Sequence, residues 1–249
     1  MVSKSNHSLC VIVPVFNEDD KIQLCIRSIL SVLQKLLIPN LLLIVNDGST
    51  DKTEQIVKKE VEKQNQSLVL ISHQRNRGYG AALQTGIQEA IKRGYGYCLF
   101  IDSDLTNDPK YIPEFVNKMS TRIDCVKASR YITGGGTVNV PIYRQIISQI
   151  GNFVSRNLFR IGIHDCTNGF RMVRLKLLKD IHFQEHDFSM ILEELYYLKK
   201  KGARFTEFPN TLKARISTNS HFHYNLTTFW QYLKYAIMAA FTRYEPHNE

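Results

Sequence analysis

One pattern occurs four times in the first part of the chain: a continuous apolar run, a polar turn, and a segment with apolar residues at helical spacing. The apolar runs are residues 9–14, 41–45, 68–72 and 97–101. Runs of this kind, without polar alternation, are typical of strands that are buried on both faces. The four strand–helix repeats predict an α/β fold with a Rossmann-like, mostly parallel sheet and helices on both of its faces.

The second part of the chain is less regular. Its pattern predicts strands at 123–128, 167–173, 204–208 and 211–216, and helices at 142–159 and 188–201. The three consecutive glycines at 134–136 indicate a loop rather than a domain boundary. Since no linker rich in Pro, Gly or Ser is present, we predict one domain over residues 1–225, followed by a helix and tail over 226–249.

Lysine and arginine number 32 against 23 aspartates and glutamates, which gives a formal net charge of +9. This excess indicates an anionic partner: nucleic acid, a phosphate-bearing ligand or an anionic membrane. The five cysteines are scattered and form no Cys-x-x-Cys pair, so neither a disulfide framework nor a zinc site is predicted. No apolar run suits a signal peptide or reaches the roughly 18 residues of a membrane span, and we expect a cytoplasmic protein.

Three polar clusters follow the predicted strands, at residues 16–18, 46–49 and 102–104. In an open parallel sheet, ligands bind beyond the carboxyl ends of the strands. An isolated Asp-x-Asp is often only a turn or a helix cap. Three such clusters after successive strands indicate a binding site.

Asp102 and Asp104 are the most informative pair in these clusters. Side chains on a strand alternate, so we expect Asp102 and Asp104 to point the same way. Two neighbouring carboxylates repel each other unless a cation lies between them. Oxygen ligands suit Mg²⁺ or Mn²⁺, which commonly also bind substrate phosphates. The pair therefore predicts a clamp for a metal and a diphosphate.

The clusters extend into longer motifs that resemble a known family. The segments VIVPVFNE (residues 11–18), NDGSTD (46–51) and DSD (102–104) resemble the family 2 glycosyltransferases of the GT-A fold. The segments ASRY (128–131) and DCTNGFR (165–171) are similar to motifs of the polyprenyl-phosphate glycosyltransferases, the dolichol-phosphate mannose synthase group. Glu193, Gly202 and the EFP of residues 207–209 also match that group in spacing.

The resemblance implies roles for individual residues. The nucleoside pocket would be lined by Pro14, Phe16 and Glu18, with Asp47 reading the base. The nucleotide would also meet Asn76, Gly78, Gly80 and Ser103. The metal and diphosphate would be held by Asp102 and Asp104. Phosphates would be faced by Arg130, Arg144 and Arg215, each of which has a solvated surface arginine as its alternative. Tyr79 departs from the family, which often has a lysine between these two glycines.

The reaction implied by the resemblance is a metal-dependent, inverting transfer of a sugar from a GDP- or UDP-linked donor to a polyprenyl (dolichyl) phosphate. Asp104 and Arg130 would serve catalysis by neutralising the charge of the leaving group. The alternative acceptor is a saccharide or another hydroxyl compound, which needs a general base. Glu193 is the candidate for a base or an acceptor-orienting group, and its alternative role is that of a carboxylate at a helix N-terminus.

Two further classes of function remain open at this level. A phosphate- or nucleic-acid-binding module would explain the charge of +9, but the chain lacks the usual motifs, and its acidic clusters would repel phosphate without a metal. We therefore predict no nucleic-acid partner. A structural homologue without activity is disfavoured by the intact Asp-x-Asp pair.

The last predicted helix carries an apolar stripe. Its members are Leu226, Phe229, Trp230, Leu233, Ile237, Ala240 and Phe241. One interpretation is a helix packed on the domain's own core. The other is a helix that lies on a membrane surface, or docks on a membrane-embedded partner, near a lipid acceptor. The second interpretation would place the protein at the cytoplasmic face of a membrane.

Overall fold

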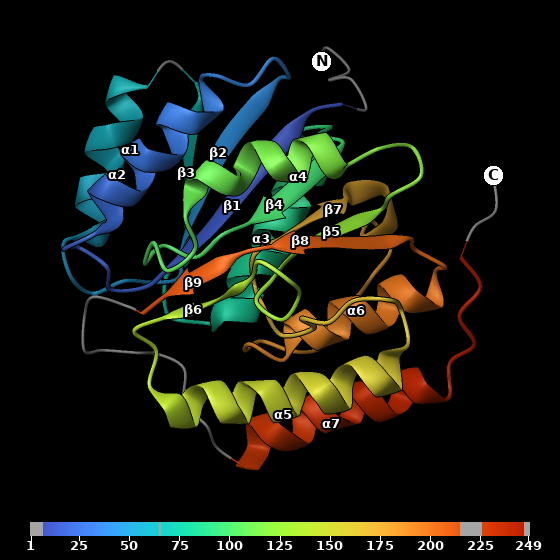
Figure 1. The fold of residues 1–249 in the computed structure, drawn as a ribbon. Coiled ribbons are helices and arrows are strands. Elements are labelled where there is room, and N and C mark those ends of the chain that lie inside the picture. The colour runs from blue at the N-terminus through green and yellow to red at the C-terminus, as the bar shows by residue number, and fades with distance from the viewer. Residues whose placement is uncertain (1–6, 65, 215–225, 247–249) are drawn as a thin grey trace.

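The computed structural model describes residues 7–64, 66–214 and 226–246, the first four of the last range as backbone only. Within these ranges, a seven-stranded sheet has the order β3-β2-β1-β4-β7-β5-β8, and β6 pairs with β9 in a small second sheet (Figure 1). The strands are β1 (Leu9–Val15), β2 (Asn40–Asn46), β3 (Leu68–Ser72), β4 (Tyr97–Phe100), β5 (Cys125–Ser129), β6 (Gly136–Val138), β7 (Arg171–Arg174), β8 (Phe205–Pro209) and β9 (Thr211–Lys213).

Seven α-helices and two short 3₁₀ turns are described within the same ranges. The helices are α1 (Ile22–Leu33), α2 (Thr53–Lys63), α3 (Tyr79–Lys92), α4 (Ile112–Lys118), α5 (Ile142–Phe159), α6 (Met190–Lys200) and α7 (Leu226–Ala240). The 3₁₀ turns are η1 (Pro109–Tyr111) and η2 (Leu175–Leu177). The expected bounds of α5 are met at both ends, because its helical pattern is bounded by Pro141 and by Arg160, which has a left-handed backbone.

The parallel pairing of the first four strands confirms the predicted sheet. The predicted strand at 167–173 is shorter than expected and runs antiparallel to both of its neighbours, β4 and β5. It begins only at Arg171, because residues 165–169 form a turn in which Asp165 accepts the backbone N–H of Asn168 at 3.1 Å. The glycine segment at 134–136 is also only partly loop, since Gly136 begins β6.

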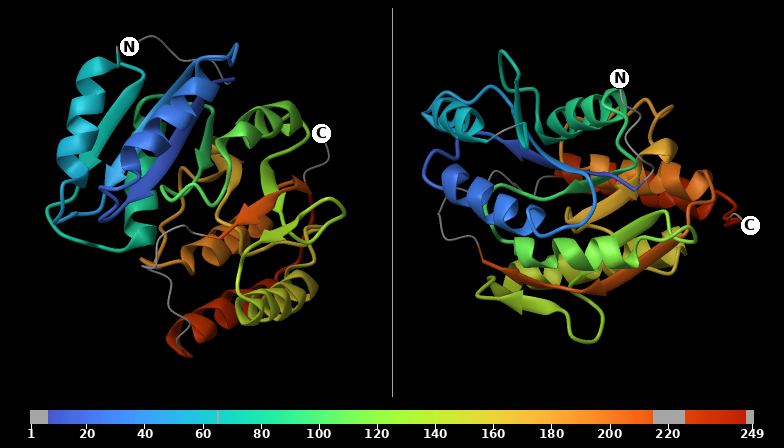
Figure 2. Two further views of the ribbon diagram at one scale, coloured as in Figure 1. Left: turned by 60° about the vertical axis from the view of Figure 1, so that its left-hand side comes forward. Right: turned by 90° about the horizontal axis from the view of Figure 1, so that it is seen from above.

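Helices cover both faces of the large sheet, and the alternation along β1 shows how. Val11 and Val13 pack into a core cluster with α1, α2 and α4. Cys10 and Ile12 point the other way, into a cluster with α3 and α6. The two further views show the sheet between these layers of helices (Figure 2). This arrangement leaves the carboxyl ends of β1, β2 and β4 at one edge of the core.

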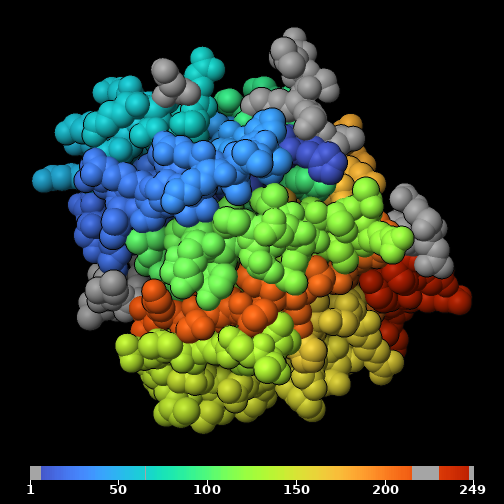
Figure 3. Space-filling model, turned by 45° about the horizontal axis from the view of Figure 1, so that its top comes forward, coloured from blue at the N-terminus to red at the C-terminus, as the bar shows by residue number. Residues whose placement is uncertain are grey.

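α5 and α7 lie side by side along the lower edge of Figure 1 and form a further layer. Phe159 of α5, Leu195 of α6 and Tyr235 of α7 belong to one buried cluster that joins this layer to the rest of the fold. In the space-filling view, β8 and β9 run as a band between α4 and the β6–α5 segment (Figure 3). Among the described helices, none combines the length and apolarity needed to cross a membrane.

The face of α7 that packs inward is not the stripe predicted from the sequence. Tyr235 and Ala236 are buried, whereas Trp230, Ile237 and Phe241 of the stripe expose 63%, 43% and 88% of their surface. The interpretation of the stripe as part of the domain's own core is therefore wrong for these three residues. Tyr235, Ala236 and Ala239 instead pack into a buried cluster with α6.

Candidate functional site

The acidic residues that follow β1 and β4 both influence the buried thiol of Cys25 on α1. Burial raises the pKa of Cys25, and the charges of Asp104, Glu18 and Asp102 raise it further. Three carboxylates from two separate loops therefore act on one buried point. The expected segments follow β1, β2 and β4 at the carboxyl edge of the sheet, and their role as a binding site stays a prediction.

Asp102 and Asp104 lie in a turn, not on the strand. β4 ends at Phe100, and Leu105 has a positive φ of 58°, so the expected alternation along a strand does not apply to the pair. Asp104 Oδ1 instead accepts the backbone N–H of Thr106 at 3.0 Å and its hydroxyl at 2.8 Å. The turn thus fixes Asp104 by a local cap, since an aspartate readily bonds the backbone two residues on.

The loops after β1 and β2 are tied to each other by polar contacts. The backbone N–H of Glu18 donates to Thr53 Oγ1 at 2.8 Å, and that of Asn17 donates to Ser49 Oγ at 3.0 Å. Phe16 is half-buried at the end of β1. Pro14 is buried within β1, where it pairs with Val45 of β2. Pro14 is therefore part of the sheet interior, and its place in a nucleoside pocket stays a prediction.

Asp47 organises the loop that follows β3. Its Oδ1 accepts the backbone N–H of Arg77 at 2.9 Å and contacts His73 Nδ1 at 2.6 Å. Its Oδ2 accepts the backbone N–H of Gly78 at 2.8 Å. These contacts use three of the roughly four acceptor positions of a carboxylate. Reading of a base by Asp47 stays a prediction, and holding this loop in place is what the geometry shows.

Gly78 and Gly80 are needed for a close approach of two backbones. A Cβ at Gly78 would lie 2.3 Å from His186 O, and one at Gly80 would lie 2.6 Å from Glu185 O. The N–H of Gly80 also donates to His186 O at 2.7 Å. The glycines thus allow residues 185–187 to pack on the loop, a contact that the sequence did not indicate. Asn76 is exposed, and its Oδ1 accepts the N–H of Gly78 at 3.1 Å.

Glu193, on α6, holds the neighbouring residues Gln184 and Glu185 in place. It is fully buried, and its two oxygens accept the backbone N–H groups of Gln184 at 2.8 Å and Glu185 at 2.9 Å. A carboxylate in this position anchors residues 184–185 against α6. Both oxygens are directed into the protein and engaged there, so anchoring is what the geometry shows, and the role of Glu193 as a base or acceptor-orienting group stays a prediction.

Glu185 links the segment to α7. Its carboxylate accepts from Tyr235 Oη at 2.8 Å, from Lys234 Nζ at 3.0 Å and from Gln231 Nε2 at 3.0 Å. Burial opposes ionisation of Glu185, but the contacts with Tyr235 and Lys234 outweigh it and lower its pKa. The loop that packs on Gly78 and Gly80 is therefore fastened to two helices, α6 through Glu193 and α7 through Glu185.

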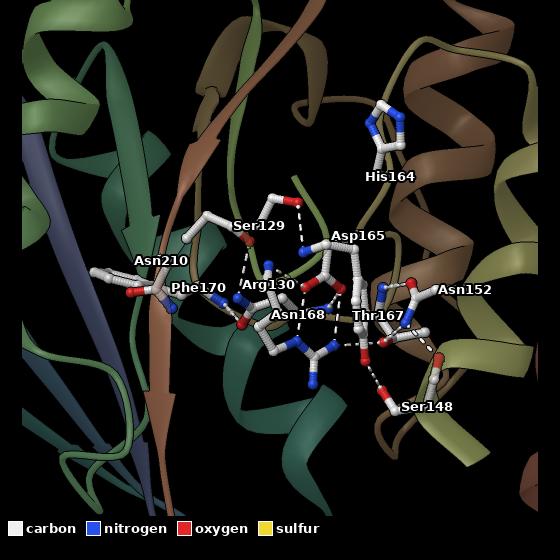
Figure 4. A network of polar contacts seen from close by, with 12 residues as sticks. Ser129, Arg130, Ser148, Asn152, His164, Asp165, Thr167, Asn168, Phe170 and Asn210 are labelled. Carbon is white, nitrogen blue, oxygen red and sulfur yellow. Dashed lines mark hydrogen bonds and ion pairs between the residues drawn. The ribbon is translucent and has the colours of Figure 1, made fainter. Parts of the chain in front are cut away.

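Arg130 is held by a buried acid (Figure 4). Its Nε lies 2.7 Å from Asp165 Oδ2, and its Nη2 lies 2.8 Å from Asp165 Oδ1 and 3.0 Å from Thr167 Oγ1. Burial opposes ionisation of Asp165, but the charge and hydrogen bonds of Arg130 outweigh it, and the pKa of Asp165 is lowered. Arg130 is thus not a solvated surface arginine, since only 11% of its side chain is exposed.

α5 supports the Arg130 site with its inner face. Asn152 donates to Thr167 Oγ1 at 2.8 Å, and its own oxygen accepts the N–H of Cys166 at 2.7 Å. Ser148, one turn earlier, contacts the hydroxyl of Tyr131 at 2.7 Å (Figure 4). These contacts join the helix to both motifs, residues 128–131 and 165–171, that resemble the polyprenyl-phosphate glycosyltransferases.

The other two predicted arginines lie elsewhere or cannot be placed. Arg144 is in the first turn of α5, where its guanidinium lies over the ring of Tyr143 at 5.9 Å and bonds the hydroxyl of that residue. Arg215 lies outside the described residues. The structure therefore brings Arg130 to a polar network, and the phosphate roles of Arg144 and Arg215 stay predictions.

The acidic site has the oxygen ligands that Mg²⁺ or Mn²⁺ prefer. No group of three or more His, Cys, Asp or Glu side chains in the described part of the chain could hold a metal by itself. Mg²⁺ is usually bound by one or two carboxylates together with substrate phosphates, rather than by a cage of protein ligands. Asp102 and Asp104 fit that mode of binding, with Ser103 buried between them.

Tyr79 is a residue of this site whose contacts the sequence did not reveal. Its ring stacks on Phe188, with ring centroids 4.3 Å apart, and its hydroxyl donates to Asp102 Oδ1 at 3.2 Å. Burial, followed by the charge of Asp102, raises the pKa of Tyr79 well above its usual value, so the hydroxyl keeps its proton. The one feature of the sequence that distinguished Tyr79 was that the family 2 glycosyltransferases often have a lysine at this position.

The chain is similar to several known proteins. Residues 10–182 match the model of the family described as glycosyl transferase family 2. The polyprenol monophosphomannose synthase of Mycolicibacterium smegmatis is 30% identical over 178 residues, which are 71% of this chain and 65% of that protein. The dolichol-phosphate mannosyltransferase of Pyrococcus furiosus is 27% identical over 227 residues, 90% of this chain and 61% of that protein. Each match spans less than two thirds of the relative.

The fold also resembles a solved enzyme. The glucosyl-3-phosphoglycerate synthase of Mycobacterium tuberculosis, crystallised with Mn²⁺, uridine diphosphate and phosphoglyceric acid, aligns with a TM-score of 0.66 at 18% identity. The alignment covers 92% of this chain and 78% of the other. Another crystal of that enzyme contains Mg²⁺ and uridine diphosphate. The likeness confirms the predicted fold class.

Proposed function

Because this chain belongs to glycosyl transferase family 2, we propose that it transfers a sugar, with inversion, from a GDP- or UDP-linked donor to a polyprenyl phosphate. The nucleoside pocket lies between Phe16, Glu18 and the Asp47 loop, and the diphosphate lies at Asp102 and Asp104. A divalent ion bound by these two carboxylates would neutralise charge on the leaving diphosphate. The names of the two curated relatives support this choice of acceptor.

The two faces of α5 provide the structural observation that carries the proposal. The inner face, through Ser148 and Asn152, supports the network that holds Arg130. The outer face exposes large apolar side chains, among them Ile142 at 69%, Ile150 at 60% and Phe153 at 62%. The same helix therefore supports the network around the Arg130 guanidinium on its inner face and carries an apolar surface on its outer face. A lipid phosphate matches both features, because its phosphate is anionic and its chain is apolar.

A phosphate acceptor also agrees with the placement of Glu193. The second pKa of a phosphate monoester is about 6, so such an acceptor is already a dianion for most of its population at neutral pH. Its oxygen can attack the anomeric carbon without loss of a proton to the protein. A buried Glu193 that anchors a loop is compatible with this reaction, whereas a hydroxyl acceptor would need a base from elsewhere in the site.

The apolar surface formed by β6, α5 and α7 supports binding to a membrane. All of the large apolar side chains that are exposed in the described part of the chain belong to these elements or directly follow α7, apart from Leu24 and Leu37. Arg156 and Arg160 are exposed at the end of α5. An apolar face bordered by basic residues is typical of a surface that lies on anionic lipid. We infer that the protein acts at the cytoplasmic face of a membrane.

A transfer assay tests the acceptor. The protein is incubated with Mn²⁺, with radiolabelled UDP- and GDP-hexoses, and with a short polyprenyl phosphate, the matching polyprenol, or phosphoglyceric acid. We expect labelled product that partitions into organic solvent with the polyprenyl phosphate alone. Transfer to phosphoglyceric acid or to the free alcohol, with none to the lipid phosphate, would overturn the proposal in favour of a hydroxyl acceptor.

A further inference from the structure

Tyr79 occupies a confined position between two loops. It is the first residue of α3 and lies between Gly78 and Gly80, the two glycines packed on His186. Its ring lies nearly parallel to that of Phe188, at an interplanar angle of 21°. The close contacts of its neighbours and the stacked ring together restrict the direction in which the hydroxyl can point.

The hydroxyl of Tyr79 points to the first aspartate of the acidic turn, Asp102, and donates to its Oδ1. Gly169 leaves the room for this contact, because a Cβ there would lie 3.1 Å from the Tyr79 hydroxyl and 3.7 Å from Asp102 Oδ2. Three separate segments of the chain are therefore arranged around one hydrogen bond.

The electrostatic surroundings explain why Asp102 needs such a partner. Asp102 and Asp104 lie one residue apart in the same turn, so two negative charges share this region, and a third charge, that of Glu18, also acts on Cys25. Like charges in such a region repel, and a carboxylate on a short side chain can turn away from its neighbours. A neutral hydroxyl can hold Asp102 in place without competing as a cation, because it donates one hydrogen bond and carries no positive charge.

We propose that Tyr79 is a positioning residue that holds Asp102 in the orientation that binds the divalent ion, with Phe188 as the platform for its ring. The proposal rests on the proposed metal and diphosphate clamp. Part of the repulsion between the carboxylates is then overcome during folding, before the ion arrives. The hydroxyl should matter for the affinity for the metal more than for the contacts of the nucleoside.

Direct measurement of Mn²⁺ binding tests this role. The free Mn²⁺ signal in electron paramagnetic resonance gives the dissociation constant, with and without uridine or guanosine diphosphate, for the whole protein and for Tyr79→Phe. We expect Tyr79→Phe to weaken Mn²⁺ binding about tenfold, which is the effect of losing one hydrogen bond to a charged group. Nucleotide binding in EDTA should be unchanged, and a high Mn²⁺ concentration should restore kcat.

Tyr244→Phe is a matched control. It also removes one tyrosine hydroxyl, but that hydroxyl donates to the backbone oxygen of Ala203 at 2.8 Å, remote in sequence from the acidic turn. Mn²⁺ affinity should be that of the unaltered protein. If Tyr79→Phe does not fold, Phe188→Leu keeps the hydroxyl but removes the stacked ring, and it should weaken Mn²⁺ binding to a smaller extent.

The outcomes separate the two proposals. Mn²⁺ binding by Tyr79→Phe and Phe188→Leu at unaltered affinity would overturn the role of Tyr79 and leave the clamp in place. Equal loss of nucleotide binding with Mn²⁺ and in EDTA would show that Tyr79 shapes the nucleoside pocket instead. If the unaltered protein binds no Mn²⁺ even with nucleoside diphosphate, the clamp itself is wrong.

Discussion

Arg130 and Asp165 form a two-point ion pair, in which Nε and Nη2 of the guanidinium lie 2.7 Å and 2.8 Å from the two carboxylate oxygens. Asp165 is fully buried, and it also accepts the backbone N–H of Arg130 at 3.0 Å. The arginine is therefore held at its backbone and at its side chain by the same acid. A cation fixed in this way loses little conformational entropy when an anion binds beside it.

Asp165→Asn should destabilise the protein in a pH-dependent manner. The folded pKa of Asp165 is lowered below its value of about 3.9 in an unfolded chain, so the stabilisation is complete above that value and is lost as pH falls toward the folded pKa. At pH 7 the substitution should cost about 3 kcal/mol, as expected when a buried pair is broken. Urea unfolding at pH 7 and pH 3 checks this. A difference between the two proteins that does not shrink at pH 3 would contradict it.

Glu193→Gln should affect folding and the donor, not proton transfer. The amide keeps one acceptor for the N–H groups of Gln184 and Glu185 but turns an NH₂ group toward the other, so we expect a loss of about 1–3 kcal/mol in the free energy of unfolding. The KM for the nucleotide sugar should rise, because the segment packs on Gly80. The pH–rate profile should keep its shape. Disappearance of the acidic limb of that profile in the variant would show that Glu193 is a general base.

Asp104→Asn should abolish transfer while the fold remains. Loss of one carboxylate of the proposed clamp removes a metal ligand and should lower kcat by about 100-fold or more. The thermal midpoint without ligand should change little, and its rise on addition of Mn²⁺ with nucleoside diphosphate should disappear. EDTA should inactivate the unaltered protein to the same extent. Full activity of the variant would exclude the clamp.

The apolar surface should bind anionic vesicles. We expect the protein to sediment with vesicles that contain phosphatidylserine, less so as salt is raised, and to lose this binding in the triple variant Ile150→Ser, Phe153→Ser, Trp230→Ser. Each of these three side chains is more than half exposed, so the fold should tolerate the changes.

Leu24→Ser with Leu37→Ser provides the control for vesicle binding. These two side chains are 60% and 103% exposed but lie on or just after α1, away from α5 and α7. Their replacement lowers surface hydrophobicity and should leave sedimentation unchanged. Equal loss of binding in both variants would show that no particular surface is responsible.

The sequence predicted the elements whose pattern is local. The four parallel strands and the bounds of α5 follow from apolar runs and helical spacing, and they are confirmed. The antiparallel direction of β7 could not be predicted, because strand direction depends on the turn at residues 165–169, which brings the chain back across the sheet. The outward direction of the α7 stripe was hidden for a related reason, since both faces of that helix carry apolar residues.

The residues of the candidate site could be proposed from the sequence, but the side chains that orient them could not. Asp102, Asp104 and Arg130 were found from their motifs, yet the partners that orient them come from distant segments. Tyr79 reaches Asp102 across 23 positions, and Asp165 reaches Arg130 across 35. Glu193 shows the reverse case, since its position was found but its burial depends on a loop whose path the sequence does not specify.

The thickness of α5 has a consequence for acceptor selection. An α-helix with its side chains measures about 10–12 Å across, so a bilayer that touches Phe153 lies about one helix diameter from the network around Asn152. Under the proposed function, a polyprenyl phosphate would need to raise only its phosphate and the first units of its chain over that height, while the remainder would stay among the lipids. The enzyme would then recognise the phosphate and the first units of the chain, and not the length of the remainder. We expect kcat/KM to level off as polyprenyl phosphates are lengthened beyond the first few isoprene units.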